Sequence, residues 1–158
     1  VQAQTTVATG VIDVSLTLTS ACTIETFLYT GASDAAPTRV IETLPFGNHP
    51  STATTARAST VIGYQCSQGS SPKLSFDGGL NRGSTTTRNM KFTAGSNDFL
   101  IPYKLYSDNY VTEIAIDGSI NLAGNFTISS ATIYAEATIP AGNSIGTYTD
   151  KVTVTLTL

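Results

Sequence analysis

Charged residues are scarce in this chain. Lys, Arg, Asp and Glu together make up 12% of the sequence, and Lys and Glu are both few. Exposed helices need a charged face, so this composition argues against long surface helices. No apolar run approaches the roughly 20 residues of a membrane-spanning helix, so we expect no membrane insertion. The net charge is −3, and no basic cluster could neutralise phosphates. We therefore expect no nucleic-acid partner.

Groups that carry chemistry are also few. The only histidine, His49, lies in a Gly-Asn-His-Pro context typical of a surface loop, and one imidazole cannot build a histidine-rich metal site. Glu113 and Asp117 are candidates for the paired carboxylates of a glycosidase, but a solvated strand end is the favoured interpretation. Asn125 begins a glycosylation triplet, Asn-Phe-Thr, within a predicted strand. We predict that the chain is not an enzyme and has no catalytic residue, metal or cofactor.

The sequence has two cysteines, Cys22 and Cys66, each in or beside a predicted strand. This placement suits a disulfide between early strands, and closing a loop of 44 residues would stabilise the fold by about 4 kcal/mol. The alternative is a pair of buried free thiols in a cytosolic protein. We favour the disulfide, and with it an oxidising compartment. The first residues, VQAQTTVATG, contain no charged or apolar region of a signal peptide, so we expect any secretory signal to be already removed.

What the chain does contain is a series of short alternating stretches of apolar and polar residues, separated by Gly, Asn, Asp and Pro. Such stretches predict β-strands, and 158 residues suffice for one domain. We therefore predict an all-β sandwich, with Asp-Gly turns at 77–78 and 117–118. Pro102 indicates an edge strand or a strand start. The predicted strands are 7–18, 23–28, 40–44, 60–66, 73–76, 89–92, 100–107, 113–116, 124–128, 131–139 and 148–158.

The first and last predicted strands alternate most clearly. Each places a row of apolar residues, or glycine, on one face. The rows are Gly10, Ile12, Val14, Leu16 and Leu18 in the first strand, and Val152, Val154, Leu156 and Leu158 in the last. The sequence ends on the last strand with no returning partner. We therefore expect one spare strand and one empty place in a sheet.

Several stretches resemble, in order, the spore coat U domain family, whose best-known members are pilins of archaic, Csu-type chaperone–usher pili. The stretches are TGVIDVSLTLTSACTI, ASTVIGYQCS, LSFDGGLNRGSTTTRNMK, IPYKLYSDN and IPAGNSIGTYTDKVTVTLTL. The most specific features are the alternating opening before the first cysteine, the Asp-Gly-Gly turn followed by Arg and Asn, and the Gly-x-Tyr-x-Asp ending. The resemblance spans nearly the whole chain and is weakest in IETFLYTGASDAAPTRVIETLPFG.

The resemblance implies an immunoglobulin-like sandwich that lacks its last strand. Residues 19–158 would form the pilin domain, and residues 1–18 would form an extension that fills the groove of a neighbouring subunit. The donor residues would be Gly10, Ile12, Val14, Leu16 and Leu18. The groove residues would be Val152, Val154, Leu156 and Leu158. The implied partners are identical or homologous pilin subunits, a periplasmic chaperone and an outer-membrane usher.

The product would be a cell-surface fibre, reached through the periplasm, that supports adhesion and biofilm formation. A shaft subunit is favoured over a tip adhesin because the chain has a donor segment and no room for a second domain. Three alternatives stay open: a secreted, lectin-like binding module whose first strand pairs within its own sheet, a spore-coat structural protein, and a hydrolase built on a β-sandwich. Gly10 is also compatible with a simple turn before the strand.

Overall fold

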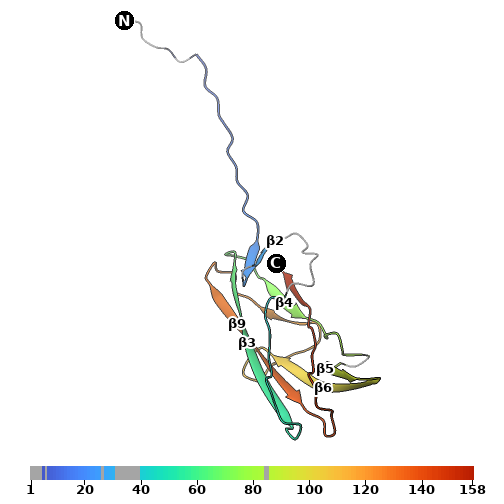
Figure 1. Ribbon diagram of the computed structural model, residues 1–158. Coiled ribbons are helices and arrows are strands. Elements are labelled where there is room, and N and C mark those ends of the chain that lie inside the picture. The colour runs from blue at the N-terminus through green and yellow to red at the C-terminus, as the bar shows by residue number, and fades with distance from the viewer. Residues whose placement is uncertain (1–4, 6, 26, 31–39, 84–85) are drawn as a thin grey trace.

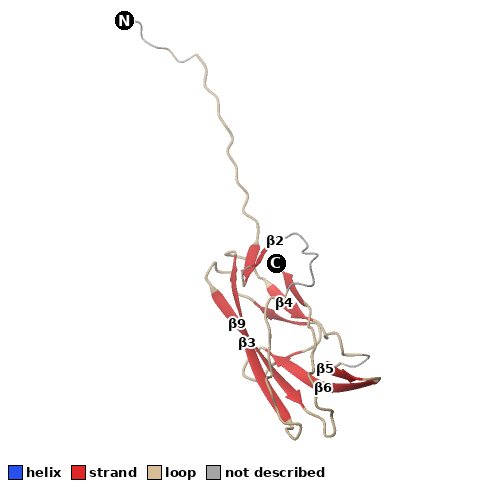
Figure 2. Cartoon of the chain, in the orientation of Figure 1, coloured by secondary structure: helices blue, strands red, loops and turns tan. Residues whose placement is uncertain are grey.

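The computed structural model describes residues 5, 7–25, 27–30, 40–83 and 86–158. In this part of the chain the regular structure is entirely β, so no helix there could cross a membrane (Figure 2). The strands are β1 (Ala21–Ile24), β2 (Phe27–Thr30), β3 (Thr55–Cys66), β4 (Lys73–Phe76), β5 (Arg88–Ala94), β6 (Asn97–Tyr106), β7 (Glu113–Ile114), β8 (Gly118–Asn121), β9 (Ser129–Thr138) and β10 (Val154–Thr157).

The strands form two antiparallel sheets. The larger has the order β2-β1-β3-β9-β6-β5, with β7 also paired to β6, and the smaller has the order β10-β4-β8. The centre of the larger sheet is the long pair of β3 and β9, whose register runs from Thr55 opposite Thr138 to Tyr64 opposite Ser129. Figure 1 shows these two strands running along the body of the molecule. The predicted all-β sandwich is confirmed.

The core lies between the two sheets and follows the two-residue period of the strands. In β3, Ile62, Tyr64 and Cys66 are buried, and the residues between them are more exposed. The same alternation buries Leu74 and Phe76 of β4. Because successive side chains of a strand point to opposite faces, each sheet contributes one apolar face to the core. The remaining buried apolar residues are Cys22, Ile24, Ala56, Ile101, Tyr103, Leu105, Ile114, Leu122, Ile133, Ala135 and Ala137.

One cation is buried among these strands. Arg88, the first residue of β5, donates from Nη1 to the carbonyl oxygen of Ile114 at 2.7 Å and from Nη2 to that of Phe76 at 3.1 Å. Its Nε donates to the Asp77 carbonyl oxygen at 2.8 Å. Burial lowers the pKa of the guanidinium. The side chain therefore joins the end of β4 to β7 through backbone carbonyl oxygens.

Three predicted strands are wrong within this chain. Residues 7–18 pair with no strand among the described residues, and residues 40–44 contain no strand. Residues 124–128 form a loop, because Phe126 adopts a φ of +59°, which no strand residue has. Asn125 therefore lies in a loop and not in a strand.

Other predictions need smaller corrections. The range 23–28 spans a hairpin, because Glu25, with a φ of +53°, ends β1. Strand β8 was not predicted. Pro102 lies in an internal strand, but the ladder between β6 and β9 stops at Tyr103, so Pro102 pairs only with β5. The Asp-Gly turn at 117–118 has its positive φ of +62° at the aspartate.

Candidate functional site

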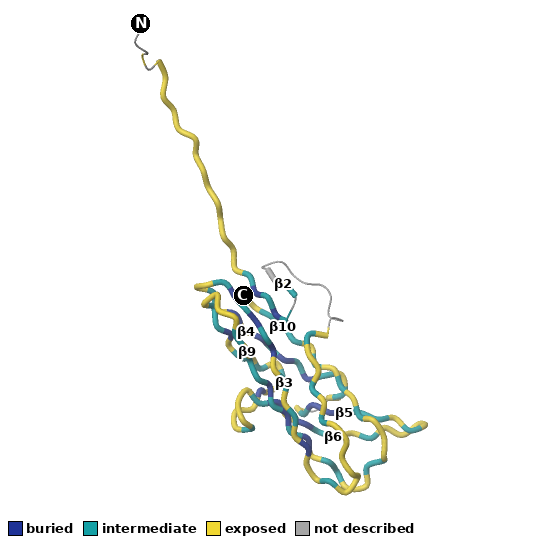
Figure 3. Tube along the Cα trace, turned by 60° about the vertical axis from the view of Figure 1, so that its left-hand side comes forward, coloured by how far each residue is buried: buried dark blue, intermediate teal, exposed yellow. Residues whose placement is uncertain are grey.

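The N-terminal segment stands apart from the body of the molecule. Residues 7–20 run from the base of β1 as an extended chain that points away from both sheets, and they are exposed (Figures 1 and 3). Ile12, Val14, Leu16 and Leu18 are between 85% and 90% exposed. The segment has the sequence of a strand but no strand partner among the described residues. A row of large apolar side chains exposed in this way is unusual for the surface of a soluble domain.

The smaller sheet has an open edge. Strand β10 is first in its order and pairs with β4, and no other described strand lies on its second side. Val152, Val154 and Leu156 are half-buried and pack against the core cluster. Leu158, the fourth predicted groove residue, is 37% exposed. The edge therefore combines free backbone groups with apolar side chains that are only partly covered.

Three further apolar residues lie partly buried against the same core. They are Ile41, Leu44 and Phe46, which belong to a segment with no strand of its own. The Phe46 ring contacts the Tyr103 ring at a centroid distance of 6.3 Å. The sequence analysis did not include these residues among the site residues. The apolar residues of the stretch VIETLPF, at 40–46, were the sequence signal that could have indicated packing against the core.

Two carboxylates fix the chain where it enters β10. Asp77 and Thr153 form a pair of hydrogen bonds: the Asp77 amide donates to the Thr153 carbonyl oxygen at 3.0 Å, and the Thr153 amide donates to Asp77 Oδ1 at 2.8 Å. Asp150 Oδ1 accepts from the Leu80 amide at 2.9 Å. The turn after β4 therefore holds the C-terminal segment in register with β4.

Tyr103 completes this arrangement from the larger sheet. Its hydroxyl donates to Asp150 Oδ2 at 2.7 Å. Burial raises the pKa of Tyr103, and the hydrogen bond to Asp150 adds to the increase. Gly79 has a φ of +78°, and a Cβ at this position would overlap the Asp150 carboxylate. The Asp-Gly-Gly turn at 77–79 and the Tyr-x-Asp motif at 148–150 therefore contact each other directly.

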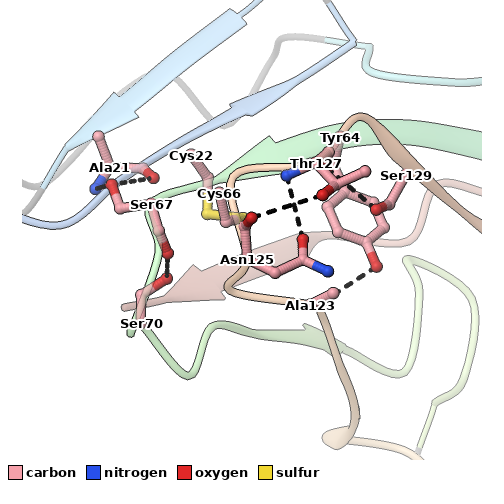
Figure 4. The surroundings of a disulfide bond; sticks show 10 residues. All are labelled: Ala21, Cys22, Tyr64, Cys66, Ser67, Ser70, Ala123, Asn125, Thr127 and Ser129. Atoms are coloured by element: carbon pink, nitrogen blue, oxygen red, sulfur yellow. Dashed lines mark hydrogen bonds between the residues drawn. A yellow bond between two sulfur atoms is a disulfide. The ribbon is translucent and has the colours of Figure 1, made fainter.

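The base of the extension is fixed by a disulfide (Figure 4). Cys22 of β1 and Cys66 of β3 are directly opposite each other, with their Cα atoms 4.1 Å apart, and are bonded through their sulfur atoms. The Ala21 amide donates to Ser67 Oγ at 2.8 Å, and the Ser67 amide donates to the Ala21 carbonyl oxygen at 2.9 Å. The predicted disulfide is present, and the chain becomes part of the sheet at Ala21.

The other candidate groups are scattered. Glu113 and Asp117 are exposed, and Glu113 Oε2 lies 3.6 Å from Lys104 Nζ. His49 is exposed, with Nε2 2.6 Å from the Phe46 carbonyl oxygen. Among the described residues, no three His, Cys, Asp or Glu side chains cluster as metal ligands would. The exposed extension and the open edge are therefore the features that the geometry singles out.

Comparisons with known proteins agree with this geometry. The chain is similar to a chain of the CsuC–CsuE chaperone–tip adhesion subunit pre-assembly complex from archaic chaperone-usher Csu pili of Acinetobacter baumannii, with 19% identity and a TM-score of 0.53. That match covers 90% of this chain and 40% of the other. A chain from a chaperone-usher pilus structure matches with 14% identity and a TM-score of 0.54, covering 99% of both chains. These likenesses confirm the immunoglobulin-like fold.

The sequence comparisons carry the assignment further. The search of curated proteins found no match. The family model described as the Spore Coat Protein U domain matches residues 8–155, which includes most of the exposed extension and the first two residues of β10. The resemblance seen in the motifs is thus confirmed, and the chain belongs to the Spore Coat Protein U domain family.

Proposed function

We propose that this chain is a structural subunit of a chaperone–usher surface fibre and that its subunits join by donor-strand exchange. One observation carries the proposal: a single chain has both an exposed strand sequence without a sheet and a sheet edge without a strand. Residues 10–18 of one subunit would add to β10 of the next. Main-chain hydrogen bonds would supply affinity, and alternate side chains would set the register.

The energies are sufficient for a stable fibre. Burial of Ile12, Val14, Leu16 and Leu18 would contribute about 6 to 12 kcal/mol before ordering costs, at about 1.5 to 3 kcal/mol for each side chain. The half-buried Val152, Val154 and Leu156 would lose their remaining exposure in the same step. Gly10 would lie where the groove has no space for a side chain. A subunit left with both surfaces uncovered would aggregate.

The proposed organisation divides the chain into a donor extension, residues 1–18, and a sandwich, residues 19–158. The start of β1 at Ala21 supports this boundary. Because every subunit carries both a donor and an acceptor edge, assembly propagates, as a shaft requires. The partners would be further copies of this or a homologous chain, a periplasmic chaperone that covers the edge before assembly, and an outer-membrane usher. The fibre would lie on the cell surface and support adhesion and biofilm formation.

The test is a denaturing gel of unheated, periplasmically expressed protein. The full chain should give a ladder of multiples that collapses on heating. A chain lacking residues 1–17 should run as a monomer, and so should Val14→Asp, because a carboxylate cannot enter the apolar groove. Val14 is almost fully exposed in the single chain, so the substitution leaves the subunit fold intact.

Ser15→Asp is the matched control. It places the same charge one position later, on the opposite face of the strand, and should keep the ladder. A full chain that runs as a single band, with a monomer that melts reversibly in solution, would contradict the proposal. That result would favour the self-contained binding module, in which the first strand completes its own sheet.

A further inference from the structure

The loop between β8 and β9 exposes two large apolar side chains. Phe126 is 67% exposed and Ile128 is 81% exposed. Figure 4 shows the neighbouring Asn125 and Thr127 in this loop, beside the disulfide. Neither the core nor the open edge of β10 uses these two residues. They are the most exposed apolar pair in the described part of this loop.

Phe126 also has an unfavourable backbone conformation. Its φ of +59° lies in the left-handed region, which is costly for a bulky residue and which Gly or Asn would adopt more easily. The conformation is held because the Phe126 amide donates to the Cys66 carbonyl oxygen at 2.9 Å and Gln65 Nε2 donates to the Phe126 carbonyl oxygen at 2.8 Å. Packing within the subunit does not explain a phenylalanine here, since its ring faces solvent. Strain of this kind often accompanies a functional contact.

The loop lies beside the base of the extension. Its hydrogen bond reaches Cys66, which is bonded to Cys22. Only two residues, Thr19 and Ser20, lie between Leu18 and Ala21. The Cα atoms of Leu18 and Ala21 are therefore at most about 11 Å apart. A neighbour that held Leu18 in its sheet would therefore lie close to this loop.

The direction of the donated strand decides which end of the neighbour comes near. The C-terminus lies near the base of the extension in the same subunit (Figure 1). If the donated strand ran parallel to β10, Leu18 would lie near the C-terminus of the neighbour. The bases of the two extensions would then meet at the point where the neighbour's own extension begins. An antiparallel donor, like every other strand pair in the structure, places Leu18 near Val152 and stacks the subunits end to end.

We propose that Phe126 and Ile128 form a second contact between subunits, packing against the end of the neighbouring copy at which β10 begins. This inference rests on the proposed function. The contact is heterologous, because a different surface of the neighbour receives the loop, and it repeats along the fibre. It covers apolar surface that the donor strand leaves exposed and limits the relative rotation of neighbouring subunits.

The experiment uses thiol labelling. Both cysteines of the chain are in the disulfide, so an introduced cysteine is the only free thiol. Phe126→Cys and Ile128→Cys are each labelled with a maleimide, first in the assembled full chain and then in the Val14→Asp background. The control is Val61→Cys, which is 51% exposed in the middle of β3.

In assembled protein, labelling at 126 or 128 should be slower than in the Val14→Asp chain by about tenfold or more, because interface cores exclude water. Labelling at 61 should not change. Equal labelling of the loop in both states, in protein that still gives the heat-sensitive ladder, would overturn the second contact alone. Absence of the ladder would overturn the fibre itself, and the contact with it.

Discussion

At the scale of residues, Tyr103 makes the stability of the fold depend on pH in the alkaline range. Its buried hydroxyl donates to Asp150, and its pKa is raised. The unfolded chain releases this proton near pH 10, whereas the folded chain keeps it. Above that pH the unfolded state therefore binds fewer protons, and stability decreases as pH rises.

We predict that Tyr103→Phe lowers the free energy of unfolding at pH 7 by about 1.5 to 3 kcal/mol, because it removes a hydrogen bond to a charged group. The difference from the parent chain should narrow as pH rises above 10. Urea unfolding of the Val14→Asp chain at pH 7 to 11, at protein concentrations low enough to keep it monomeric, measures both effects. Tyr148→Phe is the control: it removes a hydroxyl that donates to the Ser144 carbonyl oxygen and leaves Tyr103 in place. If the difference in unfolding free energy between Tyr103→Phe and the parent chain stayed constant with pH, the prediction would be contradicted.

Arg88 supports a second prediction. Arg88→Met would leave the carbonyl oxygens of Asp77 and Ile114 without this donor and would remove one of the two donors to the Phe76 carbonyl oxygen. We expect a loss of about 3 kcal/mol or more in unfolding free energy. The control, Arg57→Met, removes an exposed side chain paired with Glu136 at 2.6 Å and should change the urea midpoint little. Similar midpoints for the two variants would show that the buried contacts of Arg88 contribute little.

The sequence contained enough information to predict the disulfide, because both cysteines lie in alternating stretches. It could not reveal that Arg88 is buried. Charged residues are usually exposed, and the acceptors of Arg88 are backbone atoms up to 27 positions away. The pattern of apolar and polar residues along the sequence does not indicate which backbone atoms a side chain contacts.

At the scale of elements, the extension and β10 should bind even as separate molecules. We predict that a peptide of residues 7–18 raises the melting temperature of a chain lacking residues 1–18, by an amount that grows with the logarithm of the peptide concentration once that concentration exceeds the dissociation constant. At a concentration about 100 times the dissociation constant, the gain would be about 2.7 kcal/mol.

The control peptide carries Val14→Asp, and calorimetric melting measures both peptides. If the parent peptide produced no shift at saturating concentration, strand addition to β10 would be contradicted. A shift with both peptides would point to non-specific binding.

The three strand predictions that were wrong have different physical causes. Alternation in 7–18 is real, but a strand also needs a partner, and the part of the chain that the structure describes contains none for it. In 40–44 the apolar residues pack against the core without a ladder. In 124–128 the backbone of Phe126 turns through the left-handed region, which a side-chain pattern cannot show.

At the scale of the whole molecule, scarce charge and repeated alternation were sufficient to predict an all-β sandwich in one domain. The order of strands within each sheet was beyond the sequence, because it depends on which distant segments meet. For the site, the rows of apolar residues and an open place beside the last strand could be predicted, but the pairing of β10 with β4 follows only from the arrangement of the sheets.

The position of the disulfide determines how the molecule responds to mechanical force. A pull on the extension enters the sandwich at Ala21, and one residue later it reaches a covalent bond to β3. β1 pairs with β3 over only three residues, so few backbone hydrogen bonds join these two strands. With Cys22 bonded to Cys66, the load passes directly into the long β3–β9 pair. The hairpin of β1 and β2 is therefore shielded from tension.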